Sequence, residues 1–166
     1  NCNGALAMLS VGVTVYFVER AGILQTVDER LRANLDSARF LVQEGEPATG
    51  GWSSSTEALR AVVQRMSPDA HTGALGIVAG KAKFAPGVPL EVDLQRPDFI
   101  AAALAAVRTG SPAIATFDAG AATWRYLAAP IAVDGSPGPR TVVFAMAYDL
   151  DAELSETDDA GRPILF

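Results

Sequence analysis

An uncharged apolar run at the N-terminal end is the feature that most constrains this chain. It reads GALAMLSVGVTVYFV over residues 4–18, and an amphipathic helical pattern follows without a proline and ends near Gln43. At about 1.5 Å per residue the run is roughly 22 Å long, against a hydrocarbon core of roughly 30 Å. We therefore expect residues 1–18 to be a truncated transmembrane helix, which continues outward into a folded domain over residues 19–157.

Two other classes of segment contain runs of this kind, namely core helices and the apolar parts of signal peptides. This run has no charge before Glu19, and it closes with Tyr16 and Phe17, which suit a membrane interface. Both features favour a membrane helix over a core helix. No small-residue cleavage site precedes the amphipathic pattern, which argues against a signal peptide.

The charge and the cysteine content exclude several partners. The 166 residues carry a formal net charge of −6 and no basic block, so we expect no nucleic-acid partner. Cys2 is the only cysteine, which leaves neither a disulfide framework nor a thiolate metal site. We expect no cofactor and no bound metal.

Catalytic pairs are also missing from the sequence. His71 is the only histidine, and no serine lies in a G-x-S-x-G turn. Residues 76–81 (GIVAGK) are one residue too short for a phosphate-binding loop, and Ala82 replaces its Ser or Thr. The acidic residues that follow Tyr148 lack the glycine of a calcium loop and are typical of a solvated helix face. We expect no enzymatic activity of this chain by itself.

The amphipathic part of the first helix carries a heptad stripe. This stripe would bury against the chain's own sheet or pair with a second copy, and a polar Asn34 in the seam would fix the register of a coiled coil. We expect a homodimer along this helix. The positions assigned to the dimer are Leu24, Val27, Leu31, Asn34, Ala38 and Leu41. Leu35 and Val42 widen the stripe, while charged residues, Asp28 and Arg39 among them, fill the other faces.

The rest of the chain predicts two more helices and five strands. The helices cover residues 56–66, with Thr56 as the N-terminal cap, and residues 97–108, with Pro97 in the first turn and Gly110 as the stop. The strands cover residues 73–79, 81–84, 113–117, 123–133 and 140–148, and the last three form a meander. This order predicts an α+β domain, in which a central antiparallel sheet has its helices on one side.

The last predicted strand has two different faces. Large side chains share one face: Val142, Phe144, Met146 and Tyr148. Smaller ones share the other: Val143, Ala145 and Ala147. The small face would let a helix lie close to the sheet.

Several short motifs follow one another in a familiar order. They are VDERL at 27–31, TWRYL at 123–127 leading to Pro130, the Gly-rich turn at 134–135, and VVFAMA at 142–147 followed by Asp149. In this order they resemble the extracytoplasmic sensor domain of a bacterial two-component sensor histidine kinase, of the PDC or Cache-like type. The resemblance implies a long N-terminal helix against a central antiparallel sheet, and a second membrane helix after residues 158–166. The residues after Leu154, SETDDAGRPILF, depart from that expectation.

The resemblance also implies a function. The chain would lie on the extracytoplasmic side of a bacterial cell membrane, anchored by flanking helices. It would relay a small-molecule or protein stimulus to a cytoplasmic core, which acts as an ATP-dependent protein histidine kinase. Two alternatives stay open: a structural pilin-like subunit, and the ligand-binding domain of a chemoreceptor or other membrane-anchored receptor. The pilin-like class fits less well because its helices carry a glutamate early in the apolar segment, and none precedes Glu19 here.

Arg125 is the first candidate for contact with a ligand. On an extended strand it shares a face with apolar residues such as Leu127, so its charge must reach solvent, pair with a carboxylate or bind an anion. Tyr148 and Phe117 complete the candidate ligand site.

Three other residues are less typical of a role in ligand binding or sensing. Trp124 and Tyr126 alternate with Arg125 and are more typical of packing. His71 lies in a turn-rich segment, which is more typical of an exposed loop residue than of a pH sensor.

Overall fold

The computed structural model describes residues 3–45, 51–65, 71–86, 92–133 and 142–154. Its elements are α1 (Asn3–Glu44), α2 (Ser55–Arg65), β1 (Thr72–Val78), β2 (Lys81–Phe84), α3 (Pro97–Ala106), β3 (Ala113–Asp118), β4 (Thr123–Pro130) and β5 (Val142–Asp149). Residues 150–154 form a short helical segment after β5. The predicted α+β class, the long first helix and the antiparallel sheet are confirmed.

The five strands form one antiparallel sheet in the order β2-β1-β5-β4-β3. Strands β3, β4 and β5 are the predicted meander, and β1 and β2 are the predicted hairpin around Gly80. β4 ends at Pro130 and is shorter than predicted. The Ile131 amide still donates to the carbonyl oxygen of Val142 at 2.8 Å, and the chain then turns away, so that the Val133 amide donates to Ser55 Oγ at 3.0 Å. Residues 140–141 of the predicted last strand lie outside the described residues.

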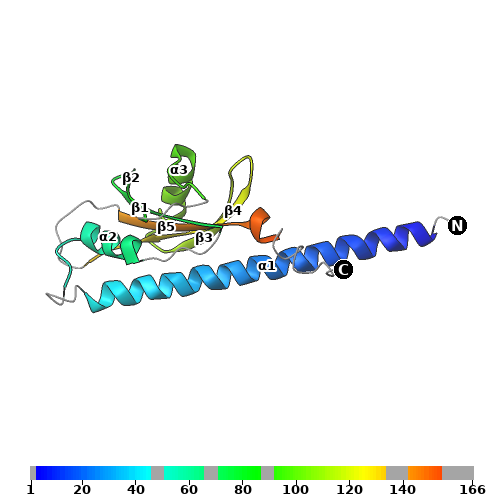
Figure 1. Ribbon diagram of the computed structural model, residues 1–166, viewed down its shortest axis with the longest axis horizontal. Helices are drawn as coiled ribbons and strands as arrows, with labels where there is room; N and C mark the ends of the chain where they lie inside the picture. Colours follow the sequence, from blue (N-terminus) through cyan, green and yellow to red (C-terminus); the bar gives the residue numbers. More distant parts are fainter. Residues whose placement is uncertain (1–2, 46–50, 66–70, 87–91, 134–141, 155–166) are drawn as a thin grey trace, which may run out of the picture.

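The helices cover both faces of the sheet, so the prediction that they lie on one side is wrong. α1 and α2 pack on one face and α3 on the other (Figure 1). The strand alternation explains both layers, since the large side chains of β5 belong to the first core and the small ones to the second. Val143, Ala145 and Ala147 lie beneath α3, as the small face predicted.

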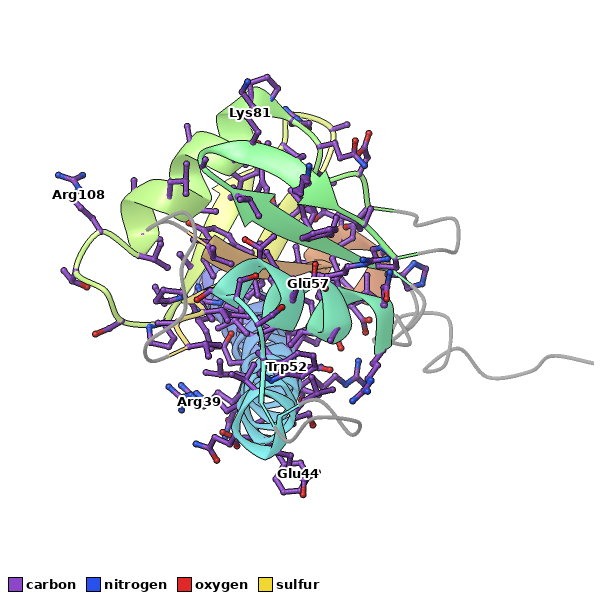
Figure 2. All side chains as sticks on the ribbon, turned by 90° about the vertical axis from the view of Figure 1, so that its left-hand side faces the viewer. Arg39, Glu44, Trp52, Glu57, Lys81 and Arg108 are labelled. Carbon is purple, nitrogen blue, oxygen red and sulfur yellow. The ribbon has the colours of Figure 1, made fainter. Side chains whose placement is uncertain are left out.

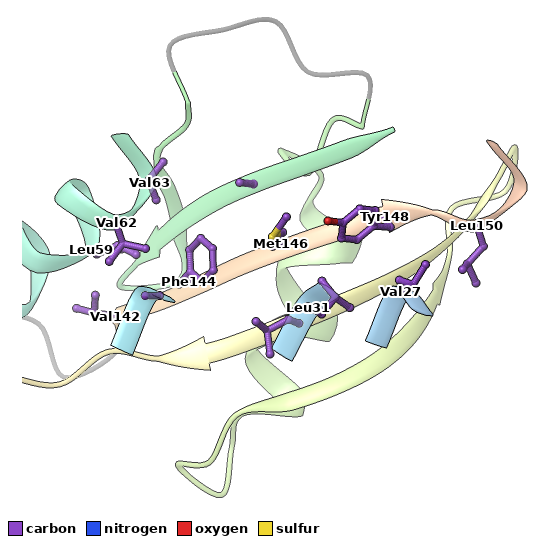
Figure 3. Close-up of a cluster of buried hydrophobic side chains, with 13 residues drawn as sticks. Val27, Leu31, Leu59, Val62, Val63, Val142, Phe144, Met146, Tyr148 and Leu150 are labelled. Carbon is purple, nitrogen blue, oxygen red and sulfur yellow. The ribbon is translucent and has the colours of Figure 1, made fainter. Parts of the chain in front are cut away.

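The core beneath α1 and α2 is aliphatic, with Phe144 and Tyr148 as its aromatic members (Figure 3). Val27 and Leu31 of α1 are 1% and 0% exposed against the sheet. Leu59 and Val63 of α2 are fully buried beside them. The N-terminal cap of α2 is Ser54 and not Thr56, because Ser54 Oγ accepts the Glu57 amide at 3.2 Å.

α1 is one continuous helix, as the sequence predicts, and it extends well past the sheet toward its N-terminus (Figure 1). It packs on the core from Ile23 to Val42. Gly45, at a φ of +78°, ends the helix in the left-handed conformation that glycine adopts without strain. The Trp52 indole then donates to the carbonyl oxygen of Val42 at 3.0 Å, which satisfies part of the last turn.

Within the described part of the chain, no helix is both long enough and apolar enough to cross a membrane.

Candidate functional site

Arg125 does not face an open site; it holds α1 against the sheet. Its Nε and Nη2 donate to the two carboxylate oxygens of Asp28, at 2.7 and 3.0 Å. Its Nη1 donates to Thr116 Oγ1 on the neighbouring strand β3, at 2.9 Å. The side chains of Arg125 and Asp28 are 23% and 18% exposed, so little water competes for this ion pair. Of the three outcomes expected for Arg125, the structure selects pairing with a carboxylate.

The charge of Arg125 is fixed by this pairing. The hydrogen bonds that Arg125 donates to Asp28 raise the pKa of Arg125 above its ordinary value, and this effect outweighs the opposing effect of burial. Asp28 itself was expected among the residues that fill the outer faces of the helix. The structure corrects that expectation, because Asp28 is partly buried and points at β4.

Tyr148 lies beside this ion pair. It is the partner of Arg125 in the β4–β5 register, and its side chain is fully buried under α1. The Arg30 guanidinium lies 6.0 Å from the centroid of the Tyr148 ring. The structure thus brings two of the three predicted ligand residues, Arg125 and Tyr148, to one place at the interface between α1 and the sheet.

The segment after β5 joins the same part of α1. Glu153 forms an ion pair with Arg30, with Nη1 and Oε2 3.5 Å apart. Asp151 Oδ2 accepts the amide of Thr123, at the start of β4, at 3.0 Å. Asp149 Oδ1 accepts the Ala152 amide at 3.1 Å and so supports the helical segment 150–154. These three acidic residues tie the segment 149–153 to α1 and β4, and are therefore more than a solvated face. The acidic residues at 156, 158 and 159 lie outside the described residues.

We call Asp28, Arg30, Arg125 and Glu153 the α1 clamp. Sequence reasoning selected Arg125 but missed its partners. The available signal was a lone charge on an otherwise apolar strand face, which requires an opposite charge from another element. Nothing local identifies that element as residue 28 of the first helix.

Phe117 belongs to the opposite face of the sheet. It packs edge-on against Phe99 of α3, with ring centroids 5.4 Å apart, and it lies beside Trp124 at 5.5 Å. The Arg96 guanidinium covers both rings, 5.7 Å from the Phe117 centroid and 5.5 Å from that of Trp124. Phe117 is thus separated from Arg125 and Tyr148 by the sheet. Trp124 and Tyr126 pack in this core, as expected.

Arg96 is held in place by its own partners. Its Nε and Nη2 donate to the Asp98 carboxylate at 3.1 and 2.7 Å, and its Nη1 donates to the carbonyl oxygen of Ala119 at 3.0 Å. The hydrogen bond from Arg96 lowers the pKa of Asp98. The cluster of Phe99, Phe117 and Trp124 is therefore a part of the core that Arg96 and its hydrogen bonds hold in place.

Several positions assigned to a homodimer are occupied within the subunit. Val27, Leu31 and Ala38 are buried against the chain's own sheet, and Leu24 and Leu41 pack partly against the same core. The Asn34 side chain donates to the carbonyl oxygen of Arg30 in its own helix, at 2.9 Å. A homodimer along α1 stays a prediction, and in this fold it would use the exposed side of the helix.

The weaker candidates take ordinary structural roles. Residues 78–81 form the tight β1–β2 turn and not a phosphate loop, with Ala79 and Gly80 at φ of +52° and +79°. His71 accepts the Asp149 amide through its backbone carbonyl at 2.9 Å. The described residues contain no group of three or more His, Cys, Asp or Glu side chains that could hold a metal ion.

Comparisons with protein-family models, with curated proteins and with solved structures found no match to this chain.

Proposed function

We propose that this chain is the extracytoplasmic signal-sensing domain of a membrane-bound two-component sensor histidine kinase, of the PDC or Cache-like type. The observation that carries the proposal is the convergence of the sheet and of the segment after β5 on one short stretch of α1. Arg125 of β4 holds Asp28, and Glu153 holds Arg30, two positions further along the same helix.

This geometry suits a domain inserted between two membrane segments. The chain arrives along α1, whose N-terminal part extends past the sheet (Figure 1). The last described helical segment, residues 150–154, returns to α1 at Arg30. The last described residues therefore lie beside α1. If membrane segments flank the domain as proposed, a change in the sheet that moves this segment relative to α1 would reach both of them.

The strength of the α1 clamp suits a switch. Arg30 and Glu153 form an ion pair in which the Arg30 side chain is 47% exposed, and such pairs contribute about 0–1 kcal/mol. The better shielded pair of Asp28 and Arg125 contributes more. Contacts of a few kcal/mol in all are within the range that a ligand with different affinities for two states can overcome.

The first test is the coding sequence that follows Phe166. A sensor kinase requires a membrane span there, followed by a pair of helices of the HAMP type. A reading frame that closes directly after Phe166 would contradict the proposal. A pilin-like subunit would instead assemble into filaments when expressed with its secretion system.

The second test measures relay through the α1 clamp. Residues 1–166 replace the sensor domain of a reporter histidine kinase, and output is read as transcription from its target promoter. We expect Arg125→Met and Glu153→Gln to change the basal output at least about threefold, because each releases one element from α1. Arg32→Gln is the matched control on the exposed side of the helix. Equal output from all four proteins, at equal amounts in the membrane, would contradict relay through this clamp.

A further inference from the structure

A groove of about 340 Å³ lies between the C-terminal half of α1 and the end of β4, on the α1 face of the sheet. Its apolar walls include Leu35, Ala38 and Val42 from α1 and Ile131 and Phe144 from the sheet side. It is separate from the α1 clamp, none of whose residues lines it. We propose that this groove binds a small apolar molecule carrying one carboxylate.

The groove exists because two neighbouring strands end at different levels. β3 begins at Ala113, which pairs with Ala128 of β4. β4 continues for two more residues, to Pro130, and there the segment at Gly110 and Pro112 turns aside at the edge of the groove. The last residues of β4 thus have α1 on one side and no further β3 residue beside them, which leaves an apolar hollow at the joint.

The charge of the lining selects the ligand. Among the described residues that line the groove, Arg39 is the only charged one, and none is a carboxylate. Figure 2 shows its guanidinium projecting sideways from α1 into solvent, and within the described residues it forms no ion pair. Gln43, one helical turn further on, adds an amide to the rim. Although the whole chain has a net charge of −6, the guanidinium of Arg39 makes the rim locally positive, which favours an anionic head over a cationic one.

The volume limits the size of the apolar body. About 340 Å³ is the volume of roughly eleven water molecules at ~30 Å³ each. It lies at the small end of the range of about 300–1,000 Å³ that is usual for ligand sites. A molecule of about ten non-hydrogen atoms would fill it, with its chain between α1 and Phe144 and its carboxylate at Arg39. Octanoate is a probe of this size and charge.

A ligand in the groove would contact both α1 and the end of β4. The groove and the α1 clamp lie at different places along the same interface between α1 and the sheet. Occupancy of the groove does not depend on signalling. The role of the bound molecule as a stimulus rests on the proposed function. Binding to the groove and the effect of binding on signalling are therefore tested separately.

The binding test uses the full 166-residue chain in nanodiscs of zwitterionic lipid, with empty nanodiscs as the blank. Octanoate is titrated by calorimetry, and octan-1-ol and octylammonium serve as neutral and cationic probes of equal length. We expect octanoate to bind with a Kd of about 0.1–1 mM, which is within reach of a ligand of about ten atoms. Added salt should weaken the binding of octanoate and leave the binding of octan-1-ol unchanged, since only octanoate binds through a charge.

Variants locate the site. Arg39→Gln should lower the affinity for octanoate about fivefold and leave the affinity for octan-1-ol unchanged, because only the charge at the rim is lost. Arg32→Gln is the matched control on the same helix and should change neither. Ala38→Leu, checked for folding by circular dichroism, should abolish binding of both probes by filling the groove.

Three results would overturn the assignment: no heat beyond the blank, octylammonium binding as tightly as octanoate, or equal effects of Arg39→Gln and Arg32→Gln. Octanoate that binds but leaves the output of the reporter chimera unchanged would contradict its role as a stimulus and leave the site standing. An output that depends on the α1 clamp, in a chain that binds no octanoate, would contradict the site and leave the proposed function standing.

Discussion

Asp28 and Arg125 are 97 positions apart in the chain and meet in a two-bonded ion pair, with distances of 2.7 and 3.0 Å. The pair links the first helix to β4, and Thr116 extends it to β3. One side chain therefore connects three elements. The position of α1 on the sheet depends on this contact as well as on the apolar stripe beneath it.

Asp28→Asn should lower the free energy of unfolding by about 1–2 kcal/mol. The uncharged amide keeps only one of the two carboxylate oxygens that accept from Arg125, so the partly buried guanidinium loses its counter-charge. The midpoint of urea unfolding measures the loss. Asp36→Asn, at an exposed position on the same helix, is the control and should change stability by less than about 0.5 kcal/mol. Equal midpoints for the two variants would show that the ion pair contributes nothing.

The pH dependence of this contact follows from the direction of the shift. Because the pKa of Arg125 is raised in the folded chain, the stabilising contribution of its charged form is fully present below the unfolded pKa and is lost only as the pH rises through the folded pKa. The difference in stability between the parent chain and Asp28→Asn should therefore be constant from about pH 7 to pH 10. Urea unfolding at both pH values checks this, and a difference that shrinks toward pH 10 would contradict it.

Gly73→Ala should destabilise the chain by about 3 kcal/mol, because a Cβ at this position would lie 2.3 Å from the carbonyl oxygen of Val92. That oxygen belongs to the segment leading into α3, so the clash would push this layer from the sheet. Gly51→Ala is the control, since nothing lies within 4 Å of its Cβ. Thermal unfolding of both variants gives the comparison, and similar melting temperatures would contradict the close approach.

Ala79→Asn should stabilise the chain by about 0.5–1 kcal/mol. Ala79 has a φ of +52° and precedes Gly80 at +79°, so both central residues of the β1–β2 turn have positive φ. Asn-Gly is the favoured pair for such a turn, whereas alanine is strained there. Ala82→Asn, at an exposed position on β2, should bring no gain in the urea midpoint. A gain at both positions would show that the turn is not the cause.

Tyr126→Phe should reduce the loss of stability at alkaline pH. Burial raises the pKa of Tyr126, so the stabilising contribution of its neutral form is present below the unfolded value of about 10 and is lost as the pH rises further. The phenol also makes a long hydrogen bond of 3.5 Å to the carbonyl oxygen of Ala102, so its removal should cost under about 1 kcal/mol at pH 7. Unfolding midpoints at pH 7, 10 and 11.5 test this, and parallel curves for the two proteins would contradict it.

Local patterns were sufficient to predict most elements of the fold. The alternation in β5 predicted two faces of different size, and both were confirmed. Pro97 in the first turn of α3 and Gly80 in the hairpin turn lie where predicted, because each acts through the conformation of its own backbone and immediate neighbours.

The partners of charged residues could not be predicted in the same way. Arg125 on an apolar strand face required a counter-charge, yet several carboxylates in the sequence could have supplied it. The choice of Asp28 depends on how α1 crosses β4, and that crossing depends on the packing of the whole stripe from Ile23 to Val42. For the same reason Phe117 was placed with Arg125 although the sheet separates them.

The sequence by itself determined the long helix, the strands and the two-faced character of β5, since these follow from side-chain periodicity and turn residues within a few positions. The tertiary structure decided that α3 covers the face opposite α1, that β1 lies beside β5, and that Asp28 meets Arg125. Periodicity shows that a strand has two different faces, but it does not predict which distant element covers each face. That choice is made by the combined packing of the elements, in which Gly73 admits the segment at Val92 and the small residues of β5 admit α3.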